Sequence, residues 1–64
     1  MSIDNLRKNF EEILVHEERA KQFYDHYIDQ LEDGEIKNEL IGIRDDEKAH
    51  IELAKRLIEL VQQR

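Results

Sequence analysis

The chain has 64 residues, of which 41% are Asp, Glu, Lys or Arg, and it contains no Cys, no Pro and only two Gly. The missing cysteines exclude disulfide-stapled mini-proteins and cysteine-ligated zinc modules, and the scarcity of turn residues excludes β-sandwiches and barrels. A chain this short buries only about 60% of its unfolded surface, so a lone helical hairpin needs a metal, a partner or both. We therefore expect oligomerisation.

The net charge is −6, and no basic stripe runs along the chain. Nucleic-acid binding is not expected, because displacing counterions from phosphates needs clustered Lys and Arg. The longest apolar run is three residues, Ile13–Val15, against the roughly 20 that a membrane helix needs. Residues 1–10 lack the pattern of a signal peptide. The expectation is a cytoplasmic protein that makes no contact with membranes.

Helical periodicity predicts a first helix over about residues 3–31, with Ser2 placed to cap its N-terminus. Apolar or tyrosine side chains recur there every three or four positions. We call the face defined by this spacing the seam. In the first helix the seam consists of Ile3, Leu6, Phe10, Ile13, Glu17, Ala20, Tyr24, Tyr27 and Leu31.

The turn signal lies almost at the midpoint of the chain, at residues 32–34. Asp33-Gly34 favours a turn because glycine takes a positive φ without a steric cost. One central turn between two helical patterns predicts an antiparallel hairpin, which forms a single domain over residues 1–64.

A second helix is predicted over about residues 35–62. Gly42 lies inside it, where it costs about 1 kcal/mol relative to Ala and marks close packing or a slight bend. The seam of this helix consists of Ile36, Leu40, Ile43, Glu47, His50, Ala54, Leu57 and Val61.

The apolar faces are wider than two helices can cover. Apolar side chains flank the seam on both helices, and such wide faces suit the interior of a four-helix bundle, which two copies of the hairpin would form. The fold class is therefore predicted as all-α: an antiparallel two-helix hairpin that dimerises into a four-helix bundle. The flanking residues are Leu14, Phe23, Ile28, Ile51, Leu53, Ile58 and Leu60.

Three ionisable residues interrupt the seam: Glu17, Glu47 and His50. Burying an uncompensated carboxylate costs several kcal/mol, so the three exceptions indicate a common partner. Counted from the turn, all three lie roughly 22 Å along the hairpin, at one level. Glu47 and His50 are three residues apart on one helical face, so their donor atoms can bind the same ion.

A two-fold axis through that level would double the set to four glutamates and two histidines. Di-iron helical bundles use this set, one Glu from each of two helices and Glu-x-x-His from each of the other two. Four carboxylates balance two divalent ions, and the donors suit iron or manganese, with zinc and cobalt also able to bind. The alternative is a buried Glu–His polar layer that fixes helix register.

The tyrosines, the other histidines and the remaining charged residues near the three ionisable residues have different expected roles. Tyr24 follows Glu17 by two turns, and its phenol is expected to hydrogen-bond a ligating glutamate, whereas Tyr27 is expected in the core. His16 and His26 fall on flanking or exposed positions and are expected in solvent. Within the run of residues 44–48 only Glu47 is expected to point inward, and Glu11, Glu12 and Glu18 are read as solvated charges.

Two motifs resemble one family. Glu17-x-x-Ala20-x-x-Phe23-Tyr24 resembles the first-helix motif of rubrerythrin and ferritin-like proteins, and residues 44–50 resemble their Glu-x-x-His helix. The closest resemblance is to the half-ferritins of the encapsulated ferritin family, over roughly residues 10–62. That resemblance implies Glu17, Glu47 and His50 as di-iron ligands across a homodimer interface, Tyr24 beside them, and ferroxidase activity with oxygen or peroxide.

The resemblance also implies partners and has two departures. Members form rings of dimers and enter an encapsulin-type protein compartment through a terminal targeting peptide, which residues 62–64 do not resemble. Either that peptide is missing from this sequence or the protein works without such a shell. Members often carry extra acidic residues beside the first-helix ligand, where this chain has His16 and Arg19.

The same residues also suggest alternatives to ferroxidase activity. The main alternative is a non-catalytic module in which any divalent metal stabilises a helical assembly. A rubrerythrin-like peroxide reductase would need an electron-donor domain with cysteines, and haemerythrin-like oxygen carriage would need more histidines on the seam.

Overall fold

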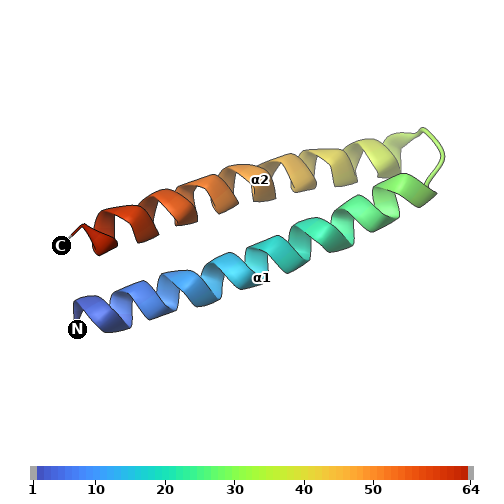
Figure 1. Cartoon of the computed structure of the whole chain (residues 1–64). Coiled ribbons are helices and arrows are strands. Elements are labelled where there is room, and N and C mark those ends of the chain that lie inside the picture. Colours follow the sequence, from blue (N-terminus) through green and yellow to red (C-terminus); the bar gives the residue numbers. More distant parts are fainter. Residues whose placement is uncertain (1, 64) are drawn as a thin grey trace.

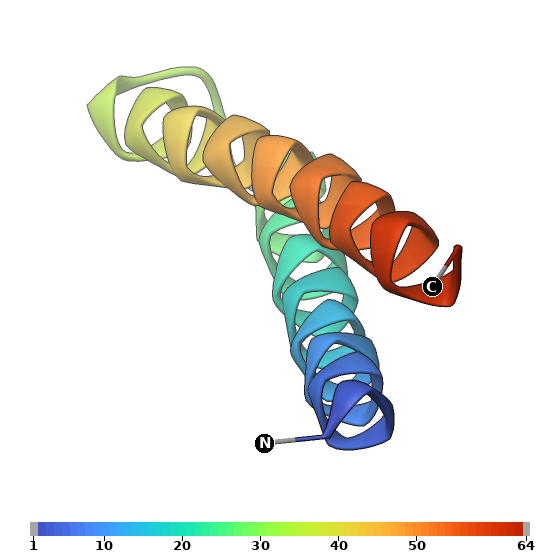
Figure 2. The same ribbon diagram turned by 90° about the vertical axis from the view of Figure 1, so that its left-hand side faces the viewer.

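The computed structural model describes residues 2–63 of the chain. Two α-helices, α1 (Ile3–Gln30) and α2 (Glu35–Gln62), pack against each other. Both termini lie at one end of the hairpin and the turn lies at the other (Figure 1). Seen from the end that carries the termini, the helices cross at an angle (Figure 2). The predicted helical hairpin is therefore confirmed, and its helix bounds differ from the prediction by one residue.

The ends of α1 follow from local hydrogen bonds. The Ser2 hydroxyl accepts a hydrogen bond from the backbone N–H of Asn5 at 3.1 Å, so the predicted cap is present. Leu31, predicted as the last helical residue, is extended instead and donates its N–H to the Tyr27 carbonyl at 3.1 Å. Within the described residues, neither helix has a stretch long and apolar enough to cross a membrane.

The structure differs from one expectation for each glycine. Gly34 precedes α2 with φ 163° and ψ −175°, an extended conformation that any residue adopts, so the expected positive φ is wrong. Gly42 is exposed, and a Cβ built on it would meet no atom within 4 Å. The close packing expected at Gly42 is therefore absent between α1 and α2.

The contact between the helices is displaced from the predicted seam toward one flank. The buried apolar residues are Ile28, Ile51 and Ala54, of which the first two were placed on the flanks. Tyr27, expected in the core, remains 42% exposed. Because the apolar face of each helix is wider than one neighbour covers, rotating the pair toward one flank leaves the other side of the seam open.

The hairpin is an extended rod without a compact core. Its radius of gyration is 14.8 Å and its dimensions are 47 × 15 × 14 Å, whereas a compact domain of this length has a radius of about 11 Å. Its accessible surface is 5147 Å², against about 4,300 Å² for a compact monomer of the same mass. The two helices therefore leave a considerable apolar area uncovered.

Candidate metal centre

Glu17, Glu47 and His50 meet between the two helices, near the middle of the hairpin. Glu17 comes from α1 and the other two from α2, and one donor atom from each lies within 4.8 Å of the other two. Among the described residues, they form the only group of three acidic or histidine side chains close enough to hold one ion. The juxtaposition predicted by counting residues from the turn is present.

The donor atoms lie close together, but Glu47 and His50 do not form a hydrogen bond. Glu47 Oε1 and His50 Nδ1 are 3.9 Å apart, too far for a hydrogen bond. Donors that bind one transition-metal ion at about 2.1 Å lie at most about 4.2 Å from one another. Small side-chain rotations would therefore bring the three donors onto a common ion.

One oxygen of Glu17, Oε2, is the only buried side-chain polar atom of the described residues without a hydrogen-bond partner. Most buried polar atoms in proteins are paired, and an exception calls for an explanation such as a bound ion. The orphaned oxygen belongs to the group that converges with Glu47 and His50, which is the reason an ion fits here.

The group opens on one side into an apolar groove. This groove has a volume of about 220 Å³. The imidazole of His50 lies at its edge, with 57% of the side chain exposed, whereas 22% of the Glu47 side chain is exposed. A ligand or a second protein chain can therefore reach the group from this side. The lining residues are Phe10, Ile13, Glu17, His50, Leu53, Ala54 and Leu57.

The donor set limits the ions that would fit. Two carboxylates and one imidazole supply two negative charges, which balance one divalent cation. Oxygen and imidazole donors without thiolate suit manganese, iron, cobalt or zinc. Three protein donors leave coordination positions open, as catalytic metal sites do.

Tyr24 is not part of the group of converging donors. It is half-buried, and its ring meets Phe23 edge to face with centroids 6.2 Å apart. Among the hydrogen bonds of residues 2–63, none joins the Tyr24 hydroxyl to Glu17, Glu47 or His50. The hydrogen bond expected of Tyr24 therefore stays a prediction for the assembled, metal-loaded protein.

The two remaining histidines lie outside the group, as expected. His16 and His26 are exposed. His26 Nε2 lies 3.2 Å from Gln30 Nε2, and its ring meets Tyr27 edge to face at 5.3 Å. Glu11, Glu12 and Glu18 are also exposed, in agreement with their interpretation as solvated charges.

Arg44 was expected in solvent, and the structure corrects this. Its side chain is 26% exposed, and its Nη1 donates to Asp25 Oδ1 across the helix pair at 3.0 Å. Its Nε also donates to Asp45 Oδ1 at 3.0 Å, and Lys21 Nζ donates to the second oxygen of Asp25 at 2.7 Å. Opposite charges on facing helices were the only sequence signal for this contact.

These hydrogen bonds shift the acid–base properties of both partners. The Lys21 ammonium and then the Arg44 guanidinium lower the pKa of Asp25 below its ordinary value. Hydrogen bonds to Asp25 and then to Asp45 raise the pKa of Arg44. The ion pair is therefore charged at any pH above the ordinary range of an aspartate.

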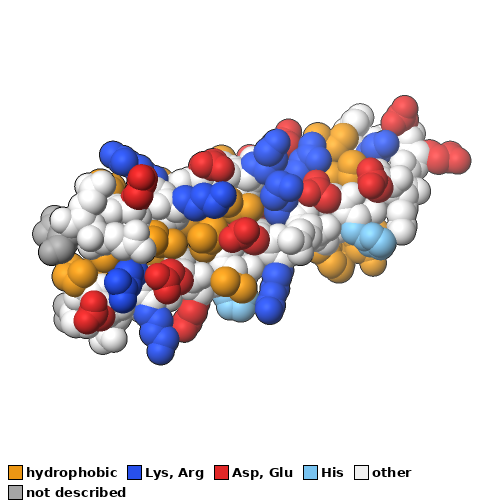
Figure 3. Space-filling model, in the orientation of Figure 1, with side chains coloured by type: hydrophobic (Ala, Val, Ile, Leu, Met, Phe, Trp, Pro, Cys, Tyr) orange, Lys and Arg blue, Asp and Glu red, His pale blue; other side chains and the backbone are white. Residues whose placement is uncertain are grey.

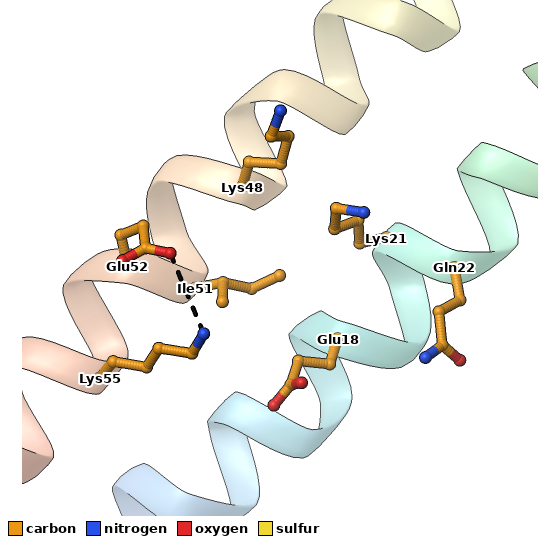
Figure 4. Close-up of a pocket in the computed structure, with 7 residues that line it drawn as sticks. All are labelled: Glu18, Lys21, Gln22, Lys48, Ile51, Glu52 and Lys55. Atoms are coloured by element: carbon orange, nitrogen blue, oxygen red, sulfur yellow. Dashed lines mark ion pairs between the residues drawn. The ribbon is translucent and has the colours of Figure 1, made fainter.

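The opposite side of the helix pair carries a charged groove. Three lysines, two glutamates and a glutamine surround the buried Ile51 (Figure 4). Lys55 Nζ lies 3.9 Å from Glu52 Oε1, and the cavity is about 300 Å³. Charged side chains of both signs line the boundary between the helices on the face seen in Figure 3. The lining residues are Glu18, Lys21, Gln22, Lys48, Ile51, Glu52 and Lys55.

Fold and site together define a helical hairpin with a candidate Glu/Glu/His metal centre. Comparison with protein-family models, with curated proteins and with solved structures found no match to this chain. The resemblance to half-ferritins therefore rests on the residues and their spacing, and stays a prediction.

Proposed function

We propose that the protein is a ferroxidase, in which two copies of the hairpin form a four-helix bundle and share a two-iron site at their interface. The observation that carries this proposal is the convergence of Glu17, Glu47 and His50 from both helices, with one Glu17 oxygen buried and unpaired. Fe(II) is the substrate bound by these side chains.

The site of one chain is incomplete for this chemistry. Its three donors serve one ion, whereas oxidation of iron by a two-electron acceptor needs a pair of ions held together. The group faces an open apolar groove, so a second copy placed there would bring the same three donors. Four carboxylates would then balance the charge of two Fe(II) ions.

The excess accessible surface of the hairpin is similar to the area that one partner buries in a standard protein–protein interface. The accessible surface of 5147 Å² exceeds that of a compact monomer by about 800 Å². A standard protein–protein interface buries about the same area on each partner. The hairpin therefore has the surface of a subunit rather than that of an isolated domain.

Exposed apolar side chains lie on both sides of the metal group along the hairpin, which a two-fold axis through the group would match. Toward the turn they are Phe23, Tyr27, Ile36 and Ile43, and toward the termini they are Ile3, Ile13, Val15, Leu53 and Leu60. An axis perpendicular to the rod would place one set against the other, with the two turns at opposite ends.

Charge favours this antiparallel arrangement. Residues 17–49, on the turn side, hold 11 of the 16 acidic residues and 5 of the 10 basic ones, and therefore carry the whole net charge of −6. The rest of the chain is neutral. Antiparallel copies would keep the two acidic halves apart, whereas parallel copies would place them side by side.

In the proposed reaction each of two Fe(II) ions gives up one electron. O₂ accepts both electrons and two protons and leaves as hydrogen peroxide. With peroxide as the oxidant, the O–O bond breaks as it accepts two electrons and two protons, and two waters form. The glutamates bind Fe(II) and stabilise Fe(III) more strongly, because anionic oxygen donors favour the ion of higher charge. His50 supplies a neutral donor at the exposed edge of the site.

Aerobic addition of Fe(II) tests the proposal. Wild-type protein should produce ferric absorbance faster than buffer, with saturation at two irons per dimer, and Glu47→Gln should abolish the acceleration. Glu18→Gln is the matched control, because Glu18 neighbours Glu17 in the chain but lines the charged groove instead.

The alternative, a metal-stabilised module without catalysis, predicts a different result. Metal would then tighten the dimer while iron oxidation proceeds at the rate of buffer autoxidation. That outcome would overturn the ferroxidase proposal and leave the metal site in place.

A further inference from the structure

The cross-helix contact of Arg44 and Asp25 joins the two helices close to the metal group. Both oxygens of Asp25 are used, one by Arg44 at 3.0 Å and the other by Lys21 at 2.7 Å. Among the described residues this is the only ion pair that joins α1 to α2, because the others link residues of one helix or of its end. We name Lys21, Asp25 and Arg44 the register clamp.

We propose that the register clamp positions α2 along α1 so that Glu47 and His50 meet Glu17, making Asp25 and Arg44 positioning residues of the metal centre. This inference rests on the proposed metal site and names a further determinant of it. Neither Asp25 nor Arg44 belongs to the group of converging donors.

The clamp is placed where it can set the register. Asp25 lies eight residues nearer the turn than Glu17 and Arg44 three residues nearer than Glu47, which correspond to about 12 Å and about 4.5 Å along a helix. With Glu17 and Glu47 taken as one level, Asp25 lies about 7.5 Å nearer the turn than Arg44, and the two side chains bridge this offset. In the observed register Arg44 Nη1 meets Asp25 Oδ1 at 3.0 Å while the donors of Glu17, Glu47 and His50 converge.

Apolar packing alone fixes this register weakly. Only Ile28, Ile51 and Ala54 are buried, and ridges of similar apolar side chains repeat along both helices. The connection of residues 31–34 keeps the helices near this register. A slide of α2 by up to one turn, about 5.4 Å, would offer the core another set of such side chains but would separate the donors. The same slide would break the bond between Asp25 and Arg44.

The clamp lies away from the groove that exposes the metal group. Lys21 lines the charged groove, and helical spacing places Asp25 and Arg44 on that same side of the pair. A second copy bound over Ile13 and Leu53 would not touch the clamp. An effect of clamp variants on metal binding would therefore arise from the register and not from a lost contact between copies.

Titration with Co(II) tests this inference, because cobalt reports both affinity and geometry through its visible spectrum. We expect Asp25→Asn and Arg44→Gln each to weaken Co(II) binding about tenfold, the size of effect found for residues that orient metal ligands. The double variant should bind no worse than the single ones. Asp25→Glu, which keeps the carboxylate, should retain wild-type affinity and spectrum.

The matched control is Arg56→Gln, which removes an ion pair with Glu59 inside α2 and should leave Co(II) binding unchanged. All variants are compared at a temperature where circular dichroism shows full helix content. If Arg44→Gln does not fold, Arg44→Lys replaces it, with an affinity expected between those of wild type and Asp25→Asn.

A second measurement follows the register itself. Spin labels at Lys8→Cys and Glu59→Cys, diluted with unlabelled protein, should give one distance in the wild type and a broader or shifted distribution in Asp25→Asn. Wild-type Co(II) affinity and unchanged distances in the clamp variants would overturn the inference. Failure of the wild-type protein to bind Co(II) would instead overturn the proposed metal site.

Discussion

The two sides of the helix pair differ in how far their apolar and charged side chains are covered or paired within one chain. On the side of the apolar groove, Leu53 and Ile13 are about half exposed and Glu17 has an unpaired oxygen. On the opposite side, Lys21, Asp25 and Arg44 form ion pairs within the chain. The other charged side chains that line the groove there, Glu18, Lys48, Glu52 and Lys55, are exposed to solvent. The side with paired or solvated charges is suited to contact with water. The side with exposed apolar side chains and an unpaired carboxylate oxygen is suited to contact with a second copy.

The largest expected effect comes from placing a charge on the apolar side. Leu53→Lys should weaken dimerisation about a hundredfold or more, because an unpaired ammonium would be buried at the interface. Sedimentation equilibrium of the metal-loaded protein measures this. Glu52→Lys, its neighbour on the charged side, should stay dimeric, and equal dimerisation of both variants would show that the wrong face has been assigned.

Removing the charge of Glu17, whose Oε2 atom is buried and unpaired, should have opposite effects without and with metal. Glu17→Gln should raise the free energy of unfolding of the metal-free protein by about 1 kcal/mol, because an unpaired carboxylate is replaced by a neutral amide. It should also abolish the stabilisation that added Co(II) gives the wild type. Thermal unfolding with chelator and with Co(II) measures both, and a lower metal-free stability would contradict this account of the orphaned oxygen.

On the charged side, the free energy of unfolding should depend on pH because of Asp25. Because Lys21 and Arg44 lower the pKa of Asp25 in the folded state, its contribution is full above about pH 4. That contribution is lost as the pH falls through the lowered pKa. Unfolding of metal-free wild type and Asp25→Asn should therefore differ at pH 6 and converge toward pH 2; a constant difference would argue against the ion pair.

The smallest effect concerns Gly42, which is exposed with open space around it. Gly42→Ala should raise the free energy of unfolding by about 0.5–1 kcal/mol, the difference in helix propensity. Urea unfolding measures it. A decrease instead would indicate that the second copy approaches the backbone of α2 closely at this position.

Local rules predicted most of the fold. Helical spacing and a single turn signal gave both helices, Ser2 gave the N-terminal cap, and residue counting placed Glu17 level with Glu47 and His50. These features depend on short-range periodicity and on the constant rise of a helix, which is why one sequence suffices for them.

The rotation of the helices about their axes was not predictable in the same way. The apolar faces are wide, so spacing alone did not show that Ile28 and Ile51 would be buried while Tyr27 stays exposed. The Arg44–Asp25 contact was missed because a long, flexible side chain can reach several positions. Gly34 was misread because a glycine permits a positive φ without requiring one.

Crystals grown with Fe(II) and measured at the iron absorption edge test the central claim most directly. The account predicts two anomalous peaks beside a two-fold axis, with Glu17, Glu47 and His50 of both copies around them and the two turns at opposite ends. Iron held within a single hairpin without donors from a second copy, or no iron at these residues, would contradict it.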